Sequence, residues 1–253
     1  MASFASSSPL PFGLGNPFSW SSMTQTSYIT KRAQSQLAKV YMTLAATVLA
    51  AAAGSYSSLK WNVFTDPSVP SLLTFVVMMA LTFMQPSKSN EAIRFGMLMT
   101  FGFLDGCVLA PLIGLSIRLD PSVLVTALLS TTLVFMCFSI SALTSSRRSL
   151  LYLGGILSST VSFMLLASLL NVFFRSTFVP WMQIYLGLVV FCGFIMFDTQ
   201  LMIEQILSGN DNYITMALNL FVDLVAVFVR ILIILLNNTE KKRDEDHRRS
   251  RHR

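Results

Sequence analysis

The chain has 253 residues, of which 53% are hydrophobic and only 12% are charged, and its net charge is +6. This composition excludes an ordinary soluble globular domain, and the mean hydropathy of +0.64 indicates that a lipid bilayer surrounds most of the chain. The basic residues lie in short loops and one tail, with no basic patch interleaved with aromatic residues, so we expect no nucleic-acid partner.

Apolar segments fill the chain between two polar ends. Residues 1–33 are rich in Ser, Pro and Gly, and we expect them to form a disordered N-terminal tail. Residues 34–238 predict an all-α fold, a polytopic membrane helix bundle of about seven transmembrane helices. Residues 239–253 carry both charge signs and are expected to form a charged C-terminal tail. The expected spans are about 36–57, 71–85, 92–117, 122–143, 150–173, 181–204 and a last one from about 214.

The third span carries two charged residues inside an apolar helix. Arg94 lies near its entry and Asp105 lies deep inside it. Eleven residues are close to three full turns, so the two side chains should share a helix face. Two interpretations stay open for Asp105: a role in an ion pathway, and a salt bridge or hydrogen bond to a neighbouring helix. The acidic residues nearer the interface, such as Glu91, are expected to be only solvated.

The fifth and sixth spans are joined by a short turn that contains Pro180. Small residues let transmembrane helices approach closely. In the fifth span these are Gly154, Gly155 and the run 158–160, so we expect close helix packing there.

The last apolar segment, residues 219–237, organises the rest of the bundle. Asn219, Asp223, Arg230 and Asn237 fall within a narrow sector of one helical face. A charged side chain near the bilayer centre costs roughly 2.5–3.5 kcal/mol on insertion scales, so this polar stripe should face protein or water rather than lipid. We therefore expect the last helix to be the central one.

Asp198 and Asp223 are the main candidate site. A short loop connects the helices that carry them, so these two helices should be antiparallel neighbours. The carboxyl groups of Asp198 and Asp223 should then lie roughly 9 Å and 14 Å, respectively, from the same membrane face. Two carboxyls in a low-dielectric site cannot easily both ionise, so they should share a proton and titrate as a unit. This predicts a proton-responsive latch. The alternative is that Asp223 simply pairs with Arg230, seven residues further on.

The distribution of basic residues does not give one consistent orientation. Outside the tail, seven Lys or Arg lie on the N-terminal side and three on the other, which places the N-terminus in the cytosol. Seven full spans would then put the basic tail on the far side, against the same rule. Either the last segment is re-entrant or the N-terminus is outside. We expect the tail to be cytosolic, since the cytosolic leaflet is anionic.

The cysteines and histidines favour neither a metal centre nor a Ser or Cys nucleophile. Cys107, Cys137 and Cys192 lie in three different apolar segments without a CxxC pair, and buried, inert thiols are expected. Both histidines, His247 and His252, lie in the charged tail. We therefore expect no cofactor and no enzymatic activity.

Three segments carry a family resemblance: Leu104–Leu112, Phe197–Gln200 and Phe221–Arg230. Together they resemble the Bax inhibitor-1 family, and its plant-type members most of all, over about residues 34–238. The resemblance implies a seven-helix bundle in the endoplasmic reticulum membrane with a central last helix. It also implies a pH-sensitive calcium leak and a role in restraining cell death.

In this resemblance Asp198 and Asp223 match the family's paired aspartates, which would form the pH sensor and a transient calcium site on the ion pathway. Two positions depart from the family pattern. Ala110-Pro111 stands where Gly-Pro is usual. Bacterial relatives place an arginine at the end of the second helix as a latch partner, where this chain reads Met84-Gln85-Pro86. Lys88 and Arg94 are the nearest substitutes.

Three function classes follow. The first is a calcium leak or channel gated by the aspartate pair. The second is a membrane-embedded regulator of cell death and stress responses without intrinsic transport, which binds cytosolic proteins through its basic tail. The third is an aspartyl intramembrane protease. Such enzymes pair Tyr-Asp with Gly-x-Gly-Asp, and this chain has only Phe197-Asp198, half of that pattern.

Overall fold

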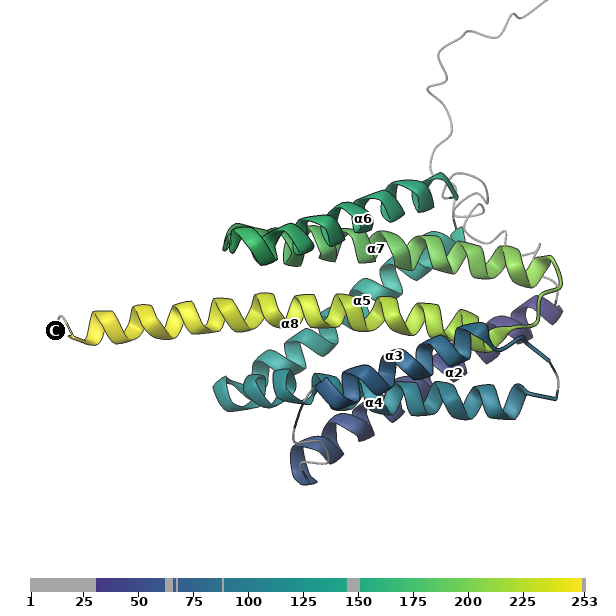
Figure 1. Cartoon of the computed structure of the whole chain (residues 1–253), viewed down its shortest axis with the longest axis horizontal. Coiled ribbons are helices and arrows are strands. Elements are labelled where there is room, and N and C mark those ends of the chain that lie inside the picture. The colour runs from purple at the N-terminus through teal and green to yellow at the C-terminus, as the bar shows by residue number, and fades with distance from the viewer. Residues whose placement is uncertain (1–30, 62–65, 67, 88, 145–150, 252–253) are drawn as a thin grey trace, which may run out of the picture.

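The computed structural model describes residues 31–61, 66, 68–87, 89–144 and 151–251, and within them the chain forms seven helices and no strand (Figure 1). The predicted N-terminal tail lies almost wholly outside the described residues. The helices are α2 Lys31–Trp61, α3 Ser68–Phe83, α4 Glu91–Leu119, α5 Pro121–Thr144, α6 Leu151–Phe174, α7 Phe178–Leu207 and α8 Tyr213–Arg251.

A helix occupies each of the seven predicted spans, and the predicted polytopic all-α bundle is confirmed. Six of these helices are long and apolar enough to cross a bilayer. The seventh, α3, has 16 residues and is about 24 Å long, shorter than a hydrocarbon core of about 30 Å. Large apolar side chains are exposed on the outer faces of α2 to α7, where they meet lipid.

The last helix, α8, is the central one, as the polar stripe predicted. It crosses the middle of the bundle in Figure 1 and packs against α2, α4, α5 and α7. Each of the other six helices exposes several large apolar side chains, whereas α8 exposes none among its described side chains. An apolar helix that shows no large apolar group to lipid must be covered by its neighbours, so α8 is the core around which the others are arranged.

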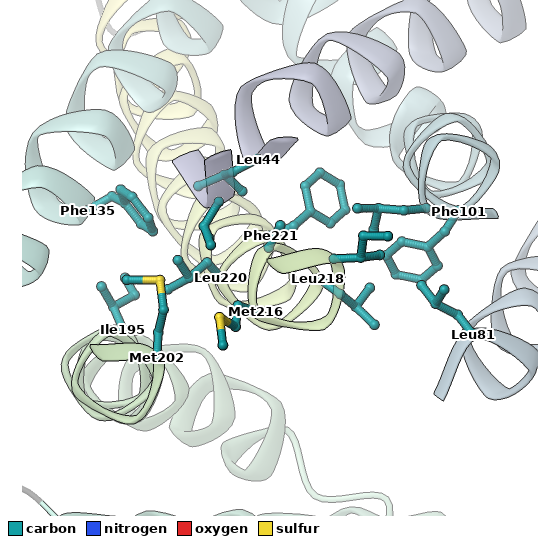
Figure 2. Close-up of a cluster of buried hydrophobic side chains, with 14 of the residues drawn as sticks. Leu44, Leu81, Phe101, Phe135, Ile195, Met202, Met216, Leu218, Leu220 and Phe221 are labelled. Carbon is teal, nitrogen blue, oxygen red and sulfur yellow. The ribbon is translucent and has the colours of Figure 1, made fainter. Parts of the chain in front are cut away.

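The largest hydrophobic cluster forms around the first half of α8 (Figure 2). Phe221 of α8 is 1% exposed, and its ring meets that of Phe101 of α4 edge-on with centroids 5.8 Å apart. Leu81 of α3 and Ile195 of α7 close the cluster on two other sides. Lipid tails are as apolar as these side chains, so close packing stabilises the cluster more than removal from water does.

The closest helix contact joins α2 to α4 through glycines that the sequence analysis did not single out. A Cβ atom at Gly106 would collide with the carbonyl oxygen of Ala51, and one at Gly54 with that of Phe103. Gly102 and Gly106 form a GxxxG spacing, which allows two membrane helices to approach closely. The prediction of close packing through residues 154–160 is wrong in part: Gly154 packs on the Phe197 ring, but Gly155, Ser158 and Ser159 are exposed.

The course of α8 decides between two of the predicted topologies. The helix is continuous over 39 residues, about 58 Å, which excludes a re-entrant last segment. The start of α2 and the end of α8 lie at opposite ends of the bundle in Figure 1. A cytosolic tail therefore requires the start of α2 to lie on the other side of the membrane. The predicted 239–253 tail continues α8 without a helical break up to Arg251.

Candidate functional site

The structure brings Asp198 of α7 and Asp223 of α8 together at the middle of the bundle. Asp198 lies nine residues before the end of α7 and Asp223 ten residues after the start of α8, so both are about 14–15 Å from the same membrane face. Their side chains hydrogen-bond to each other. Asp223 is 4% exposed. The pair thus lies well inside the bundle, about three turns from the ends of the two helices that the turn connects.

A hydrogen bond between two carboxyl groups needs a proton on one of them, since two carboxylates have no donor and repel. Such a bond between Asp198 and Asp223 would link α7 to α8 through one shared proton. The Oδ2 atom of Asp223 is buried, and no described N–H or O–H group donates a hydrogen bond to it.

Polar side chains of α2, α5 and α7 lie close to one another at the residues next to Asp198 in the sequence of α7. Thr199 follows Asp198 and is fully buried, and Tyr41 of α2 interacts with Thr199 and with Ser139 of α5. Gln200 donates from Nε2 to the carbonyl oxygen of Ala142 in α5, at 3.1 Å. Sequence reasoning missed Tyr41 and Ser139, because a single Tyr or Ser in an apolar helix gives no signal of the direction in which it points.

Asp105, the second candidate, stands alone. It lies in the middle of α4, and its Oδ2 atom is buried without a hydrogen-bond partner. Among the described side chains it forms no ion pair with Arg94, which lies eleven residues earlier on the same helix, or with any other cation. The pairing interpretation of Asp105 is therefore wrong for the described part of the chain, and the pathway interpretation stays a prediction.

Arg94 fixes the start of α4 to the turn between α7 and α8. Its Nη1 atom donates to Oδ1 of Asn212 and its Nη2 atom to the hydroxyl of Thr215, both at 2.8 Å. Arg94 is thus no substitute for the latch arginine of bacterial relatives, and Lys88 lies outside the described residues. Glu91 is not merely solvated, because its Oε1 atom accepts a hydrogen bond of 2.8 Å from the hydroxyl of Tyr213.

These contacts border a polar hollow of about 380 Å³ at this end of the bundle. Lys39, Glu91, Arg94 and Asp211 contribute charges of both signs to its lining. The hollow opens where α2, α4 and α8 begin, so water and ions can approach the start of α8 from this membrane face.

Arg230, the other charged residue of α8, does not pair with Asp223. Its Nη1 atom donates to the carbonyl oxygen of Ala226 at 2.8 Å, and its guanidinium carbon lies 4.3 Å from the centroid of the Phe191 ring. No ion pair joins Arg230 to Asp223 among the described side chains, so the simple pairing alternative is wrong. Of the remaining stripe residues, Asn237 is half-buried, whereas Asn219 is exposed, and the prediction of an interior position is wrong for Asn219.

The cysteines are free thiols, as their spacing suggested, but not all are buried. Cys107 is buried and donates to the carbonyl oxygen of Gly54 at 3.3 Å, and Cys192 is half-buried. Cys137 is exposed on the outer face of α5, which corrects its predicted burial. Within the described residues no three His, Cys, Asp or Glu side chains cluster closely enough to hold a metal ion.

The fold and the site together define a class: a polytopic membrane protein whose central helix carries an ionisable site shared with the preceding helix. A family comparison specifies it further. The chain belongs to the family described as Inhibitor of apoptosis-promoting Bax1, whose profile matches residues 33–240. The three resembling segments of the sequence all lie inside this range.

Individual relatives agree with this assignment. Human Bax inhibitor 1 is 41% identical over 219 residues, which cover 87% of this chain and 92% of the human protein. Rice Bax inhibitor 1 is 37% identical over 252 residues, 99% of this chain and all of the rice protein. Drosophila Bax inhibitor 1 is 39% identical over 83% of this chain and 85% of its own. The likeness to a plant member thus extends over nearly the whole chain.

Proposed function

We propose that this protein is a pH-sensitive calcium leak of the endoplasmic reticulum membrane that suppresses programmed cell death. The observation that carries the leak is the hydrogen-bonded aspartate pair between α7 and α8, at mid-depth in the bundle. The names of the relatives support the role in cell death, since each is called a Bax inhibitor. The family resemblance supports the endoplasmic reticulum as the location.

The pair works as a latch. While one proton is shared, one carboxyl donates to the other and holds α7 against α8 in the closed state. Loss of the proton leaves two anions in a poor dielectric, and they either separate or take a cation between them. Flux should therefore rise with pH through the range in which the pair loses its proton.

Calcium is the cargo of this site and not a resident cofactor. It prefers six to eight oxygen ligands, and two carboxylates with a few carbonyl groups supply fewer. Weak coordination suits passage, because an ion that is to cross must also leave. We propose no enzymatic role, and no cofactor, for the aspartate pair.

Purified protein in liposomes tests the proposal. Wild-type protein should pass Ca²⁺ at a rate that depends on pH, and a variant with both Asp198 and Asp223 changed to Asn should lose that dependence. Wild-type flux and wild-type pH dependence in the double variant would eliminate the latch.

Absence of flux at every pH would instead favour the regulator class, which acts without transport. One observation fits that second function: α8 continues past the apolar segment, and Glu240, Lys241, Lys242 and Arg243 are exposed on it. A rigid, charged helical extension is a suitable surface for a cytosolic protein partner. Deletion of the tail that preserves flux but removes cell protection would assign protection to this surface.

A further inference from the structure

Helices α7 and α8 run antiparallel, and their side chains meet in a regular register along one seam. Asp198 pairs with Asp223 at one level. Seven residues earlier on α7 and seven later on α8, Phe191 meets Arg230. Seven residues are close to two helical turns, or about 10 Å, so the arginine lies on the same face as the aspartates and roughly 10 Å along the seam.

We infer that Arg230 is a fixed positive charge that limits cation passage along the α7–α8 seam and discriminates against divalent cations. This inference rests on the proposed leak at the aspartate pair. It adds to the leak a residue that sets its rate and its preference for ion charge.

The guanidinium of Arg230 is held without being neutralised. It packs over Gly187, where a Cβ atom would collide with its Nε, and it lies 4.3 Å from the Phe191 ring centroid. Its one described hydrogen bond goes to a backbone carbonyl, that of Ala226. An aromatic face and a carbonyl stabilise a cation without an opposite charge, so the full positive charge remains in the seam.

Such a charge acts on ions in proportion to their valence. A cation held between Asp198 and Asp223 and leaving toward the end of α8 must approach Arg230. At about 10 Å, the separation between Arg230 and the pair, and an effective dielectric of about 20, the repulsion lowers the occupancy of the pair by a monovalent cation roughly tenfold, and flux falls with occupancy. The free-energy penalty doubles for a divalent ion, so the rate falls by the square of that factor, roughly a hundredfold.

The valence ratio provides the test. K⁺ and Ca²⁺ fluxes are measured in liposomes with wild-type protein and with Arg230→Met, which keeps the apolar stem and removes the charge. We expect K⁺ flux to rise about tenfold and Ca²⁺ flux about a hundredfold. Arg230→Lys keeps the charge and should stay near wild type. Arg230→Gln is a second neutral variant and should show the same ratio if Arg230→Met does not fold.

A second cation that lies on an aromatic ring offers a matched control. The amine of Lys60 lies 5.5 Å from the Trp61 ring centroid, at the exposed end of α2. Salt screens a charge exposed to water, so Lys60→Met should leave both fluxes unchanged.

The outcomes separate this inference from the proposed function. Equal enhancement of K⁺ and Ca²⁺ in the neutral variants would show a loosened seam and would overturn the charge barrier. Wild-type fluxes in the neutral variants would also overturn the charge barrier. The proposed leak would still stand in that case if the Asp198→Asn, Asp223→Asn double variant had a changed pH response. No flux from the wild-type protein would overturn both.

Discussion

The aspartate pair allows a single-residue test of the latch with a defined magnitude. Asp223→Asn keeps the size of the side chain, and its amide can donate a hydrogen bond to Asp198 at every pH. The shared proton is thereby replaced by a permanent donor. Because Asp223 is 4% exposed, water cannot easily take over this bond.

The strength of that bond sets the expected change in flux. A hydrogen bond to a charged group contributes about 1.5–3 kcal/mol, and each 1.4 kcal/mol is tenfold in an equilibrium. Wild-type flux should therefore rise roughly 10- to 150-fold between the protonated and deprotonated states of the pair. With a single proton involved, the rise is at most about tenfold for each pH unit.

The assay is Ca²⁺ release from liposomes, followed over about pH 5 to 9 with wild type, Asp223→Asn and Asp223→Leu. The Asn variant should stay at the closed, low-flux level without a pH-dependent rise. The Leu variant cannot donate a hydrogen bond, and its flux should lie above that of the Asn variant. A wild-type rise of flux with pH in Asp223→Asn would refute the shared-proton latch.

The remaining predictions concern the frame around the pair. Arg94→Met removes a buried guanidinium together with its two hydrogen bonds. This change should lower the free energy of unfolding in detergent by about 1.5–3 kcal/mol. Unchanged stability would show that the contact of α4 with the α7–α8 turn is dispensable. Gly106→Val should destabilise by about 1–3 kcal/mol, because a Cβ atom meets the α2 backbone, whereas Gly155→Val, with open space around it, should be neutral. A protease added to intact microsomes should remove a C-terminal tag, since we expect residues 240–253 to be cytosolic; protection of the tag would contradict this expectation.

The fold could be predicted from the sequence almost completely, because the bilayer imposes a simple rule. Each run of about 20 apolar residues must be a helix, and a helix with an ionisable stripe must be covered by protein. Asp223 and Arg230 were sufficient to identify α8 as central. The exposure of Asn219 could not be predicted, since helical periodicity gives the face of a residue but not where the neighbouring helices end.

The aspartate pair could be predicted from the sequence, but neither its depth in the bundle nor the nearby polar residues Tyr41 and Ser139 could be. From the sequence we expected Asp198 about 9 Å from the membrane face, because the sixth span was expected to end near residue 204. In the structure α7 continues to Leu207. The three added residues bring Asp198 to the depth of Asp223. The partners of Arg94 were beyond prediction, since a basic residue at a helix entry usually extends into water.

The charges inside this bundle are kept apart from one another. Among the described side chains Arg94 is bound by an amide and a hydroxyl, Arg230 by an aromatic ring and a carbonyl, and the aspartates by each other. A buried carboxylate neutralised by an arginine would have little affinity left for a proton or a metal cation. Two carboxyls that have only each other must take up a proton or a cation to be stable in a low-dielectric site. The proposed latch therefore depends on the separation of acidic from basic groups around Asp198 and Asp223.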